Sequence, residues 1–368
     1  MEKLRLCLII PTLQAGGMER VMSELAGFFC QKENLNVELI LFGKDPEIFY
    51  PLPENLKIHL PKSEFKNRFR FYYTIERLLF LRKTVRKINP DTVLSFGELW
   101  NSFVLIALAG LHLPVYISDR CSPTRSFNAF HTLLRNLLYP GAAGIIVQTR
   151  KAQSIYQSKF RHTRIEVIGN PIRSIEPRNG LKKEDIVLMV GRLIKTKHQD
   201  KLIELFIRLS KPGWKLVIVG YDHLKQNNSQ KLRSIIAENN AQEYVYLEGK
   251  KANVEEYYLK SRIFAFTSSS EGFPNVIGEA MSAGLPAVAF DCTAGPSEMI
   301  TDGYNGFLVP LFDYAQFEER LEKLMIDEVL REKLGANARD SIKRFSCEKV
   351  CNDFYEFILQ TGKVSDRV

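Results

Sequence analysis

The sequence of 368 residues lacks long apolar runs, and this absence narrows the possible classes of protein. No segment reaches the roughly 18 apolar residues that a membrane-spanning helix needs. The strongest candidate, residues 103–117, is interrupted by His112 and Pro114 and is typical of a helix followed by a buried strand. No small-residue cleavage site follows the apolar run at residues 4–10, so we expect a first strand there rather than a signal peptide.

Metal-binding patterns are also missing. The six cysteines, at positions 7, 30, 121, 292, 347 and 351, show no metal-ligand spacing, which predicts free thiols in a reducing cytoplasm. An Asp-x-Asp triplet, which could recruit a divalent cation to a diphosphate, is absent as well. We therefore expect neither a metal nor a cofactor.

The charge is distributed unevenly along the chain. The formal net charge of +9 lies entirely in residues 1–172, where 23 Lys and Arg stand against 14 Asp and Glu, while the remainder carries 28 of each. Such asymmetry suggests that the first half faces a polyanion or an anionic membrane. No zinc spacing, RNA-binding signature or compact basic recognition helix accompanies this charge, so we do not expect a nucleic-acid partner.

What the sequence does contain is a repeated alternation of buried strands and amphipathic helices. Strand patterns occur at 4–10, 37–42, 92–96, 115–118, 143–148 and 164–168, and again at 186–190, 215–219, 244–247, 263–267, 287–290 and 307–309. The segment 173–184 between the two series has charges, a proline and Asn-Gly but no periodicity, as in a linker. This alternation predicts an α/β protein of two Rossmann-like, doubly wound domains, residues 1–172 and 173–345, facing across a cleft.

The segment 266–286 combines the end of a strand, a loop with Gly and Pro, and a helix that starts near Asn275. The N–H groups at such a helix start favour an anion, and Glu271 and Glu279 flank them. Carboxylates beside a phosphate site suit neutral hydroxyls, and a nucleotide sugar offers both groups. The alternative is a strand–loop–helix corner with two solvated glutamates.

Two other loops follow first strands of their domains, where ligands bind in such sheets. Arg192 and Lys197 follow the strand at 186–190 and could hold a diphosphate, Arg by a forked contact and Lys by a point charge. Gly16-Gly17 follows the strand at 4–10; glycine permits a positive φ and a close backbone approach to a ligand. This pair is not a dinucleotide-binding fingerprint, because the full glycine pattern and the later acidic residue are missing.

Taken together, these motifs resemble the family 4 glycosyltransferases, which have the GT-B fold and retain anomeric configuration. The resemblance rests on Gly16-Gly17 with Glu19-Arg20, Gly191-Arg192-Leu193 with Lys197, the Glu271/Glu279 pair around Gly-Phe-Pro-Asn, and Gly295-Pro296-Ser297-Glu298. It covers nearly the whole chain in the right order. It also implies that the last helix, within residues 346–368, packs back on the first domain.

The resemblance implies roles for single residues. Glu271 would contact the donor sugar hydroxyls, and Glu279 would bind the ribose. Arg192 and Lys197 would hold the diphosphate, and Gly16 and Gly17 would approach it. The remaining donor-binding positions are the loop around Gly249 and Lys250, for the base, and the backbone of Gly272, Phe273, Pro274, Asn275 and Val276, for the sugar and distal phosphate.

Charge then suggests the mechanism. Cleavage of a sugar–diphosphate bond concentrates negative charge on the leaving group, where the Arg, the Lys, the amides and a helix dipole would stabilise it without a metal. Glu271 and Glu279 could instead be the acid and base of a glycosidase, but the adjacent Arg/Lys grip disfavours hydrolysis. Asp119, after the strand at 115–118, is the candidate base or positioning residue on the acceptor side; the alternative is an ion pair with Arg120.

The segment 66–87 interleaves aromatic residues with eight basic residues and one acid. On a helix, Lys66, Arg70 and Arg77 would share a face that suits an anionic inner-membrane surface or a lipid diphosphate. In resembling enzymes this region approaches a polyprenyl-diphosphate-linked acceptor. The alternative is a solvated helix with a core stripe.

We therefore predict a cytoplasmic enzyme, peripheral on the inner face of the cytoplasmic membrane. It would be a metal-independent, retaining glycosyltransferase that uses a nucleotide sugar, UDP-linked, to extend a lipid-linked glycan for a surface polysaccharide, lipopolysaccharide or protein glycan. The opening around Gly16-Gly17, the Cys121-Ser122-Pro123 stretch and the Glu-Gly-Phe-Pro-Asn loop are similar to N-acetylgalactosamine transferases that act on polyprenyl-linked acceptors. A nucleotide-sugar epimerase of the same fold and a non-catalytic, sugar-nucleotide-binding subunit are the alternatives.

Overall fold

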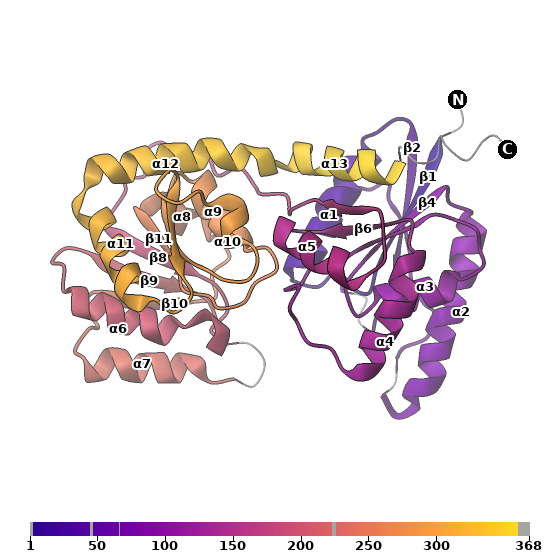
Figure 1. Ribbon diagram of the computed structural model, residues 1–368, viewed down its shortest axis with the longest axis horizontal. Coiled ribbons are helices and arrows are strands. Elements are labelled where there is room, and N and C mark those ends of the chain that lie inside the picture. The colour runs from indigo at the N-terminus through magenta and orange to yellow at the C-terminus, as the bar shows by residue number, and fades with distance from the viewer. Residues whose placement is uncertain (1–2, 45–46, 66, 223–225, 360–368) are drawn as a thin grey trace. The chain divides into compact units, whose positions relative to one another are not determined.

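The computed structural model describes residues 3–44, 47–65, 67–222 and 226–359. The chain forms two compact units (Figure 1). Unit 1 extends to Pro171 and includes the helix that begins at Cys347, and unit 2 comprises Ile172–Ser346. The predicted domain limits differ from these boundaries by one residue.

Unit 1 is built on a parallel sheet of seven strands in the order β3-β2-β1-β4-β5-β6-β7. Its central strands are mostly apolar, as expected where helices cover both faces of a sheet, and β4 and β5 are buried at every residue. The strands are β1 (Leu4–Ile10), β2 (Leu35–Leu41), β3 (Lys57–His59), β4 (Thr92–Phe96), β5 (Val115–Ser118), β6 (Gly144–Val147) and β7 (Ile165–Val167).

The helices of unit 1 are α1 (Gly17–Cys30), α2 (Arg70–Ile88), α3 (Asn101–Leu108), α4 (Ala129–Leu138), α5 (Arg150–Lys159) and α13 (Cys347–Leu359), with single 3₁₀ turns at Asn67–Phe69 and Tyr139–Gly141. The core-facing periodicity in the sequence predicts α2 only from Ile75, but the helix begins at Arg70. Its first turns project from the core, so no buried residue marks them: Arg70, Phe71 and Tyr72 are all exposed.

Unit 2 has a parallel sheet of six strands in the order β10-β9-β8-β11-β12-β13. The strands are β8 (Ile186–Val190), β9 (Lys215–Val219), β10 (Val245–Gly249), β11 (Ile263–Phe266), β12 (Ala287–Asp291) and β13 (Gly306–Pro310). The helices are α6 (Gln199–Leu209), α7 (Asn228–Glu238), α8 (Glu255–Lys260), α9 (Asn275–Ser282), α10 (Pro296–Met299), α11 (Tyr314–Ile326) and α12 (Glu328–Ile342), with 3₁₀ turns at Lys195–Lys197 and Lys343–Phe345.

The strand order of each sheet reverses at one point. In unit 1 the reversal lies between β1 and β4, and in unit 2 it lies between β8 and β11. The loops that leave adjacent strands there run to opposite faces of the sheet and leave a crevice at the carboxyl ends of the strands, which is where open α/β sheets bind ligands. Each unit therefore has a defined position for a site.

The last helix, α13, packs within unit 1 against α1 and β4. Phe354 stacks at a tilt beside Phe96 of β4, with ring centroids 6.0 Å apart, and the hydroxyl of Tyr355 accepts a hydrogen bond from Asn34 at 2.7 Å. The helix thus contributes to the core of the unit that begins the chain. Within the described part of the chain, no helix has both the length and the apolar content needed to cross a membrane.

Candidate active site

The reversal point of unit 2 is bridged by an ion pair. Lys197 ends the loop after β8, Glu271 lies in the loop after β11, and the ammonium and Oε1 are 2.5 Å apart. Both side chains are mostly buried, with exposed fractions of 13% and 15%. The ammonium also lies 5.1 Å from the centre of the Phe266 ring. The two residues predicted to grip the diphosphate and the sugar therefore contact each other directly.

The same two loops are joined by hydrogen bonds from a run of small polar residues. The hydroxyl of Thr267 donates to the carbonyl of Lys197 at 2.7 Å, and the N–H of Ser269 donates to the carbonyl of Thr196 at 2.8 Å. The sequence analysis assigned no role to this run, although Thr-Ser-Ser-Ser directly after a buried strand was a usable signal. These bonds fix the position of the Lys197 backbone.

The loop from Gly272 leads into α9 at Asn275, as predicted. Fewer backbone N–H groups than predicted can face an anion here. Pro274 has no N–H, and the N–H of Asn275 donates to the carbonyl of Phe273 at 3.0 Å. The predicted anion site therefore depends on the N–H groups of Gly272, Phe273 and Val276.

Gly295, in the Gly-Pro-Ser-Glu motif, explains how this loop is held. Its φ is +110°, and a Cβ built on it would lie 2.3 Å from Cδ of Pro274. Only glycine allows the loop of Pro274 to lie against the chain at this point. The motif at residues 295–298 therefore supports the loop at residues 272–274, which we call the donor loop after its predicted role.

Glu279 lies on the second turn of α9, where its side chain is buried. One carboxylate oxygen accepts a hydrogen bond from the hydroxyl of Tyr258 at 3.0 Å, and the other lies 3.8 Å from the guanidinium of Arg173. The carboxylate is thus oriented by its neighbours before any ligand binds. A ribose hydroxyl would have to approach this preset position.

The other predicted donor-binding positions lie at carboxyl ends of strands in the same sheet. Arg192 is exposed in the loop after β8, and its carbonyl accepts from the side chain of Gln199 at 2.9 Å. Gly249 ends β10 with a φ of +71°, and the ammonium of Lys250 lies 5.3 Å from the Tyr221 ring centre. The structure therefore brings Arg192 and Lys197 into one loop and places Gly249 and Lys250 two strands away.

Gly16 and Gly17 occupy the start of α1, but neither uses the positive φ that glycine permits. Gly16 has a φ of −166°, which is ordinary extended backbone, and neither glycine has a positive φ. A Cβ on Gly16 would lie 2.1 Å from the carboxylate of Glu19. A side chain at position 16 would displace the Glu19 carboxylate, which lies over this glycine.

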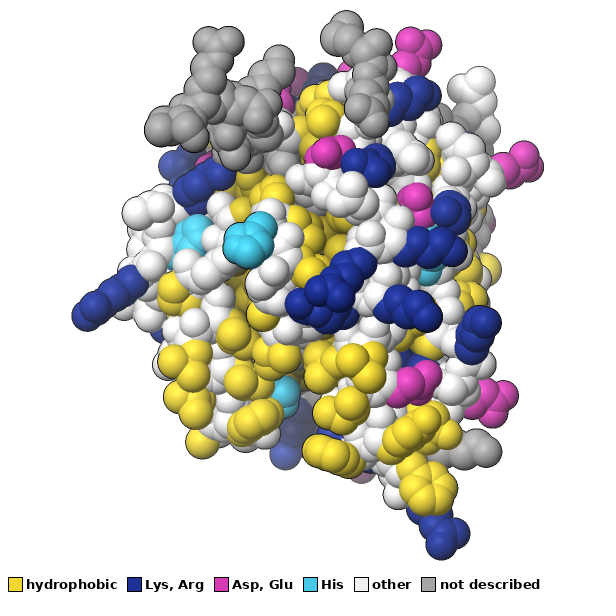
Figure 2. All heavy atoms as spheres, turned by 90° about the vertical axis from the view of Figure 1, so that its right-hand side faces the viewer, with side chains coloured by type: hydrophobic (Ala, Val, Ile, Leu, Met, Phe, Trp, Pro, Cys, Tyr) yellow, Lys and Arg dark blue, Asp and Glu magenta, His cyan; other side chains and the backbone are white. Residues whose placement is uncertain are grey.

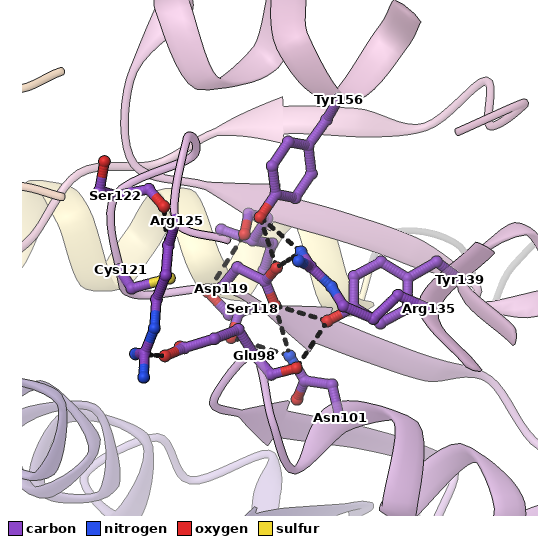
Figure 3. Close-up of polar contacts among 11 residues, drawn as sticks. Glu98, Asn101, Ser118, Asp119, Cys121, Ser122, Arg125, Arg135, Tyr139 and Tyr156 are labelled. Carbon is purple, nitrogen blue, oxygen red and sulfur yellow. Dashed lines mark hydrogen bonds and ion pairs between the residues drawn. The ribbon is translucent and has the colours of Figure 1, made fainter. Parts of the chain in front are cut away.

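Asp119 is the prediction that the structure corrects most clearly (Figure 3). Its side chain is 2% exposed, and both carboxylate oxygens accept hydrogen bonds. Oδ1 accepts from the Asn101 amide at 2.8 Å and from the Tyr139 hydroxyl at 2.9 Å. Oδ2 accepts from Arg135 and from the Tyr156 hydroxyl, each at 2.5 Å. A carboxylate held in this way is a structural anchor and not a base for a substrate, and its partner is Arg135 rather than Arg120.

The surroundings of Asp119 shift the pKa values of its partners. Burial and the negative charge of Asp119 both raise the pKa of Tyr139 and of Tyr156, so these hydroxyls stay protonated and keep donating. Burial disfavours the charge on Arg135, but the charge of Asp119 together with the neighbouring Tyr139 and Tyr156 outweighs burial and raises the pKa of Arg135. The network is therefore a permanent ion pair with two phenol donors.

Two carboxylates for which no role was predicted lie at the reversal point of unit 1. Glu19 follows β1 at the start of α1, and Glu98 follows β4. Burial raises the pKa of Glu19; hydrogen bonding to its own backbone N–H opposes this, and the nearby charge of Glu98 adds to it. Glu98 pairs with the guanidinium of Arg125 at 2.8 Å. A carboxylate with a raised pKa at a reversal point is a typical mark of a functional site.

The predicted basic face at residues 66–77 is only partly present. Lys66 lies outside the described residues. Arg70 is exposed on the first turn of α2, but Arg77 is buried, and its guanidinium donates to the hydroxyl and the carbonyl of Ser63 and pairs with Glu76. Arg77 cannot meet a membrane or a lipid diphosphate from this position, because its charge is directed into the fold. Within the described residues, no group of three or more His, Cys, Asp or Glu side chains could hold a metal ion.

Comparisons with known proteins agree with this geometry. The family described as Glycosyltransferase Family 4 matches residues 15–174, and the family Glycosyl transferases group 1 matches residues 172–341. An amylovoran biosynthesis glycosyltransferase of Erwinia amylovora is 30% identical over 345 residues, which cover 90% of this chain and 93% of the relative. An N-acetylgalactosaminyltransferase of Campylobacter jejuni, whose named acceptor is a glycan on diphospho-undecaprenol, is 25% identical over 97% of this chain and 99% of its own length.

The solved structure of a lipopolysaccharide outer core galactosyltransferase superposes with a TM-score of 0.79 at 21% identity, over 97% of this chain and 100% of its own. Two doubly wound parallel units make up the GT-B fold, which this chain shares with that structure. The chain belongs to family 4 of the glycosyltransferases.

Proposed function

We propose that this glycosyltransferase moves a sugar, N-acetylgalactosamine, from a UDP-linked donor to a lipid-linked glycan, with retention of anomeric configuration and without a metal. The acceptor would belong to the assembly of a surface polysaccharide, lipopolysaccharide or protein glycan. Support for the acceptor class comes from the Campylobacter jejuni relative, which is named for a diphospho-undecaprenol-linked glycan. Support for the sugar comes from the same name.

The observation that carries the proposal is the ion pair between Lys197 and Glu271 across the reversal point of unit 2. A donor diphosphate would take the ammonium of Lys197 into a charge-assisted contact, and Glu271 would then be released to accept hydrogen bonds from sugar hydroxyls. Arg192, on the same loop, would add a second cation. Negative charge would grow on the leaving diphosphate where these cations already lie.

This arrangement also motivates the proposal of metal independence. Mg²⁺ commonly neutralises a transferring diphosphate in other enzymes, whereas here Lys197, Arg192 and the N–H groups of the 272–276 loop would do so. A metal chelator is therefore expected to leave the rate of transfer unchanged.

On the acceptor side we assign to Glu19 the role that the sequence analysis gave to Asp119. The raised pKa of Glu19 makes its carboxylate a better proton acceptor than an ordinary glutamate. Its position at the reversal point of unit 1 would let it bind or deprotonate an acceptor hydroxyl. The enzyme would work at the membrane surface that holds the lipid-linked acceptor.

The proposal is tested with a panel of UDP- and GDP-sugars incubated with membrane lipid extract, with the products identified by mass. We expect one UDP-sugar, UDP-N-acetylgalactosamine, to be consumed only when lipid acceptor is present, in buffer that contains EDTA. The anomeric configuration of the product, read by NMR coupling constants, tests retention. If no donor is consumed in any combination, the proposal fails.

The same assay separates the two alternatives. An epimerase of the GT-B fold would convert the donor sugar when no acceptor is present. A non-catalytic binding subunit would bind UDP but consume no donor, and Glu271→Gln would change nothing in the products. Donor consumption that requires both the acceptor and Glu271 would exclude both alternatives.

A further inference from the structure

Helix α4 buries its charged residue and exposes apolar residues, which is the reverse of an ordinary surface helix. Its only charged residue, Arg135, faces inward and is buried in the ion pair with Asp119. Its outward face carries Phe130, Leu133 and Leu137, with exposed fractions of 64%, 56% and 67%. These positions, spaced three and four residues apart, form one stripe on a helix. An amphipathic helix in water shows the opposite arrangement.

Two neighbouring helices extend this stripe. Helix α3 contacts both α2 and α4, and Ile106 of α3 is exposed. On α2 the exposed apolar residues again recur at helical spacing. They are Phe71, Tyr72, Ile75 and Leu79. Figure 2 looks onto this side of unit 1, where hydrophobic side chains gather on the lower part of the surface, bordered by Lys and Arg. We call the exposed apolar residues of α2, α3 and α4 the apolar face.

The border of the apolar face is cationic. Exposed basic residues lie before and at both ends of α2, namely Arg68, Arg70, Lys83, Arg86 and Lys87. The three helices contain one acidic residue, Glu76, and it is bonded to Ser63 and Arg77. Apolar side chains bordered by cations fit a surface that is apolar below and anionic above, which is the boundary of an anionic bilayer.

A protein partner or a second copy fits these observations less well. Protein interfaces are depleted of Lys at their centre and need a complementary anionic rim, and a second copy of this face would bring the same cations together. The net charge of +9 in residues 1–172 adds to the attraction that an anionic lipid surface would exert. The occupant that charge complementarity selects is the lipid bilayer.

We propose that the apolar face, led by Phe130, Leu133 and Leu137 of α4, inserts into the interface of an anionic membrane while the basic residues of α2 contact lipid headgroups. This inference deepens the proposed function, because it identifies the surface that brings the enzyme to its lipid-linked acceptor. It also gives the Asp119–Arg135 ion pair a purpose, since that pair turns the charged side of α4 away from the lipid.

Flotation of the full chain with vesicles tests the proposal without donor or acceptor. Vesicles of phosphatidylethanolamine with roughly 30 mol% phosphatidylglycerol are compared with vesicles of phosphatidylcholine. We expect binding to the anionic vesicles only. Combined Phe130→Gln, Leu133→Gln and Leu137→Gln substitutions should lower the partition coefficient at least about thirtyfold. A matched control, Ile326→Gln with Val329→Gln, alters equally exposed apolar residues of unit 2 and should leave it unchanged.

Three results would overturn the proposal. They are the absence of wild-type binding to anionic vesicles, binding by the triple variant within about twofold of wild type, and a wild-type dimer in light scattering that the triple variant dissociates. The last result would mean that a second copy covers the face. Unchanged far-UV circular dichroism and thermal unfolding of the triple variant, whose substitutions are all at exposed positions, show that lost binding is not lost folding.

Insertion is separated from simple electrostatic adsorption by a depth probe. In the Leu137→Trp variant, brominated lipids should quench the new tryptophan, whereas Val329→Trp should give no added quenching. Equal quenching of both variants would contradict insertion.

Sugar transfer to acceptor dispersed in detergent is measured in parallel. A triple variant that transfers normally in detergent but loses vesicle binding supports the membrane face, while a wild type that binds vesicles but transfers no sugar refutes the proposed function alone.

Discussion

The guanidinium of Arg135 lies 2.5 Å from the carboxylate of Asp119, and this contact joins α4 to the end of β5. Both side chains are almost fully buried, at 3% and 2% exposure. The pair turns the charged side of α4 inward and leaves Leu133 and Leu137 of that helix exposed. Asp119, which the sequence suggested as a catalytic base, therefore orients a helix at the surface of its unit.

Removal of one partner of this pair should destabilise the protein. For Asp119→Asn we expect the free energy of unfolding, measured with urea, to fall by about 3 kcal/mol, because Arg135 keeps its charge in a buried site without a counter-ion. Asp340→Asn, which removes one partner of an exposed pair with Lys343, is the control and should have no measurable effect. Unchanged stability of Asp119→Asn together with a large loss of turnover would instead make Asp119 a catalytic residue.

Lys197 and Glu271 should respond differently to substitution. We expect Lys197→Ala to weaken UDP binding by about 10- to 100-fold, because a charge-assisted contact is lost. Glu271→Gln should leave UDP binding unchanged or tighten it, since the diphosphate no longer competes with a carboxylate for Lys197, yet donor turnover should fall about 100-fold. Calorimetry with UDP and a turnover assay measure the two effects. Equal weakening of UDP binding by both substitutions would contradict this exchange of partners.

Gly295 should tolerate no side chain. In Gly295→Ala the new Cβ would overlap with Pro274 and occupy a strained φ, so we expect the donor loop to shift and the KM for the donor to rise about tenfold. Gly303→Ala is the matched control, because its φ is also positive, at +71°, but no atom lies within 4 Å of the added carbon. If both variants raise KM equally, backbone strain rather than the contact with Pro274 is responsible.

The stability of the sheet edge in unit 1 should depend on pH through Glu38 of β2. Burial alone raises the pKa of Glu38, but hydrogen bonds from His59 of β3 and from Lys57 outweigh it, so the pKa lies below its ordinary value of 4.5. The stabilisation is therefore complete above pH 4.5 and is lost as the pH falls through the lowered pKa. We expect Glu38→Gln to cost about 1 kcal/mol at pH 7. This difference from wild type in urea unfolding should shrink as the pH is lowered below 4.5, and a constant difference would contradict the prediction.

The strands and the loops that follow them could be predicted because their signals are local. A parallel strand with both faces covered is a continuous apolar run in the sequence, as in β8 and β11. The order of strands and helices then places the ends of these strands at ligand-binding positions. Glu271 and Lys197 were predicted to share a site because both lie in loops after strands of the second domain and match motifs of one family. That they contact each other was not predictable, since 74 residues separate them.

The sequence by itself determined the alternation of strands and helices, the basic first half and the glycine and acidic motifs, because each depends on residues within a few positions of one another. The tertiary structure alone decided which charges are accessible. Arg77 and Asp119 are residue types expected at a functional surface, but each is directed into the fold by a partner elsewhere in the chain. The partner of Arg77 is Ser63, and the partner of Asp119 is Arg135. The exposed leucines of α4 have the same cause. Burying Arg135 beside Asp119 costs less free energy than leaving Asp119 buried without a partner. The charged side of α4 therefore faces inward, and its apolar side faces out.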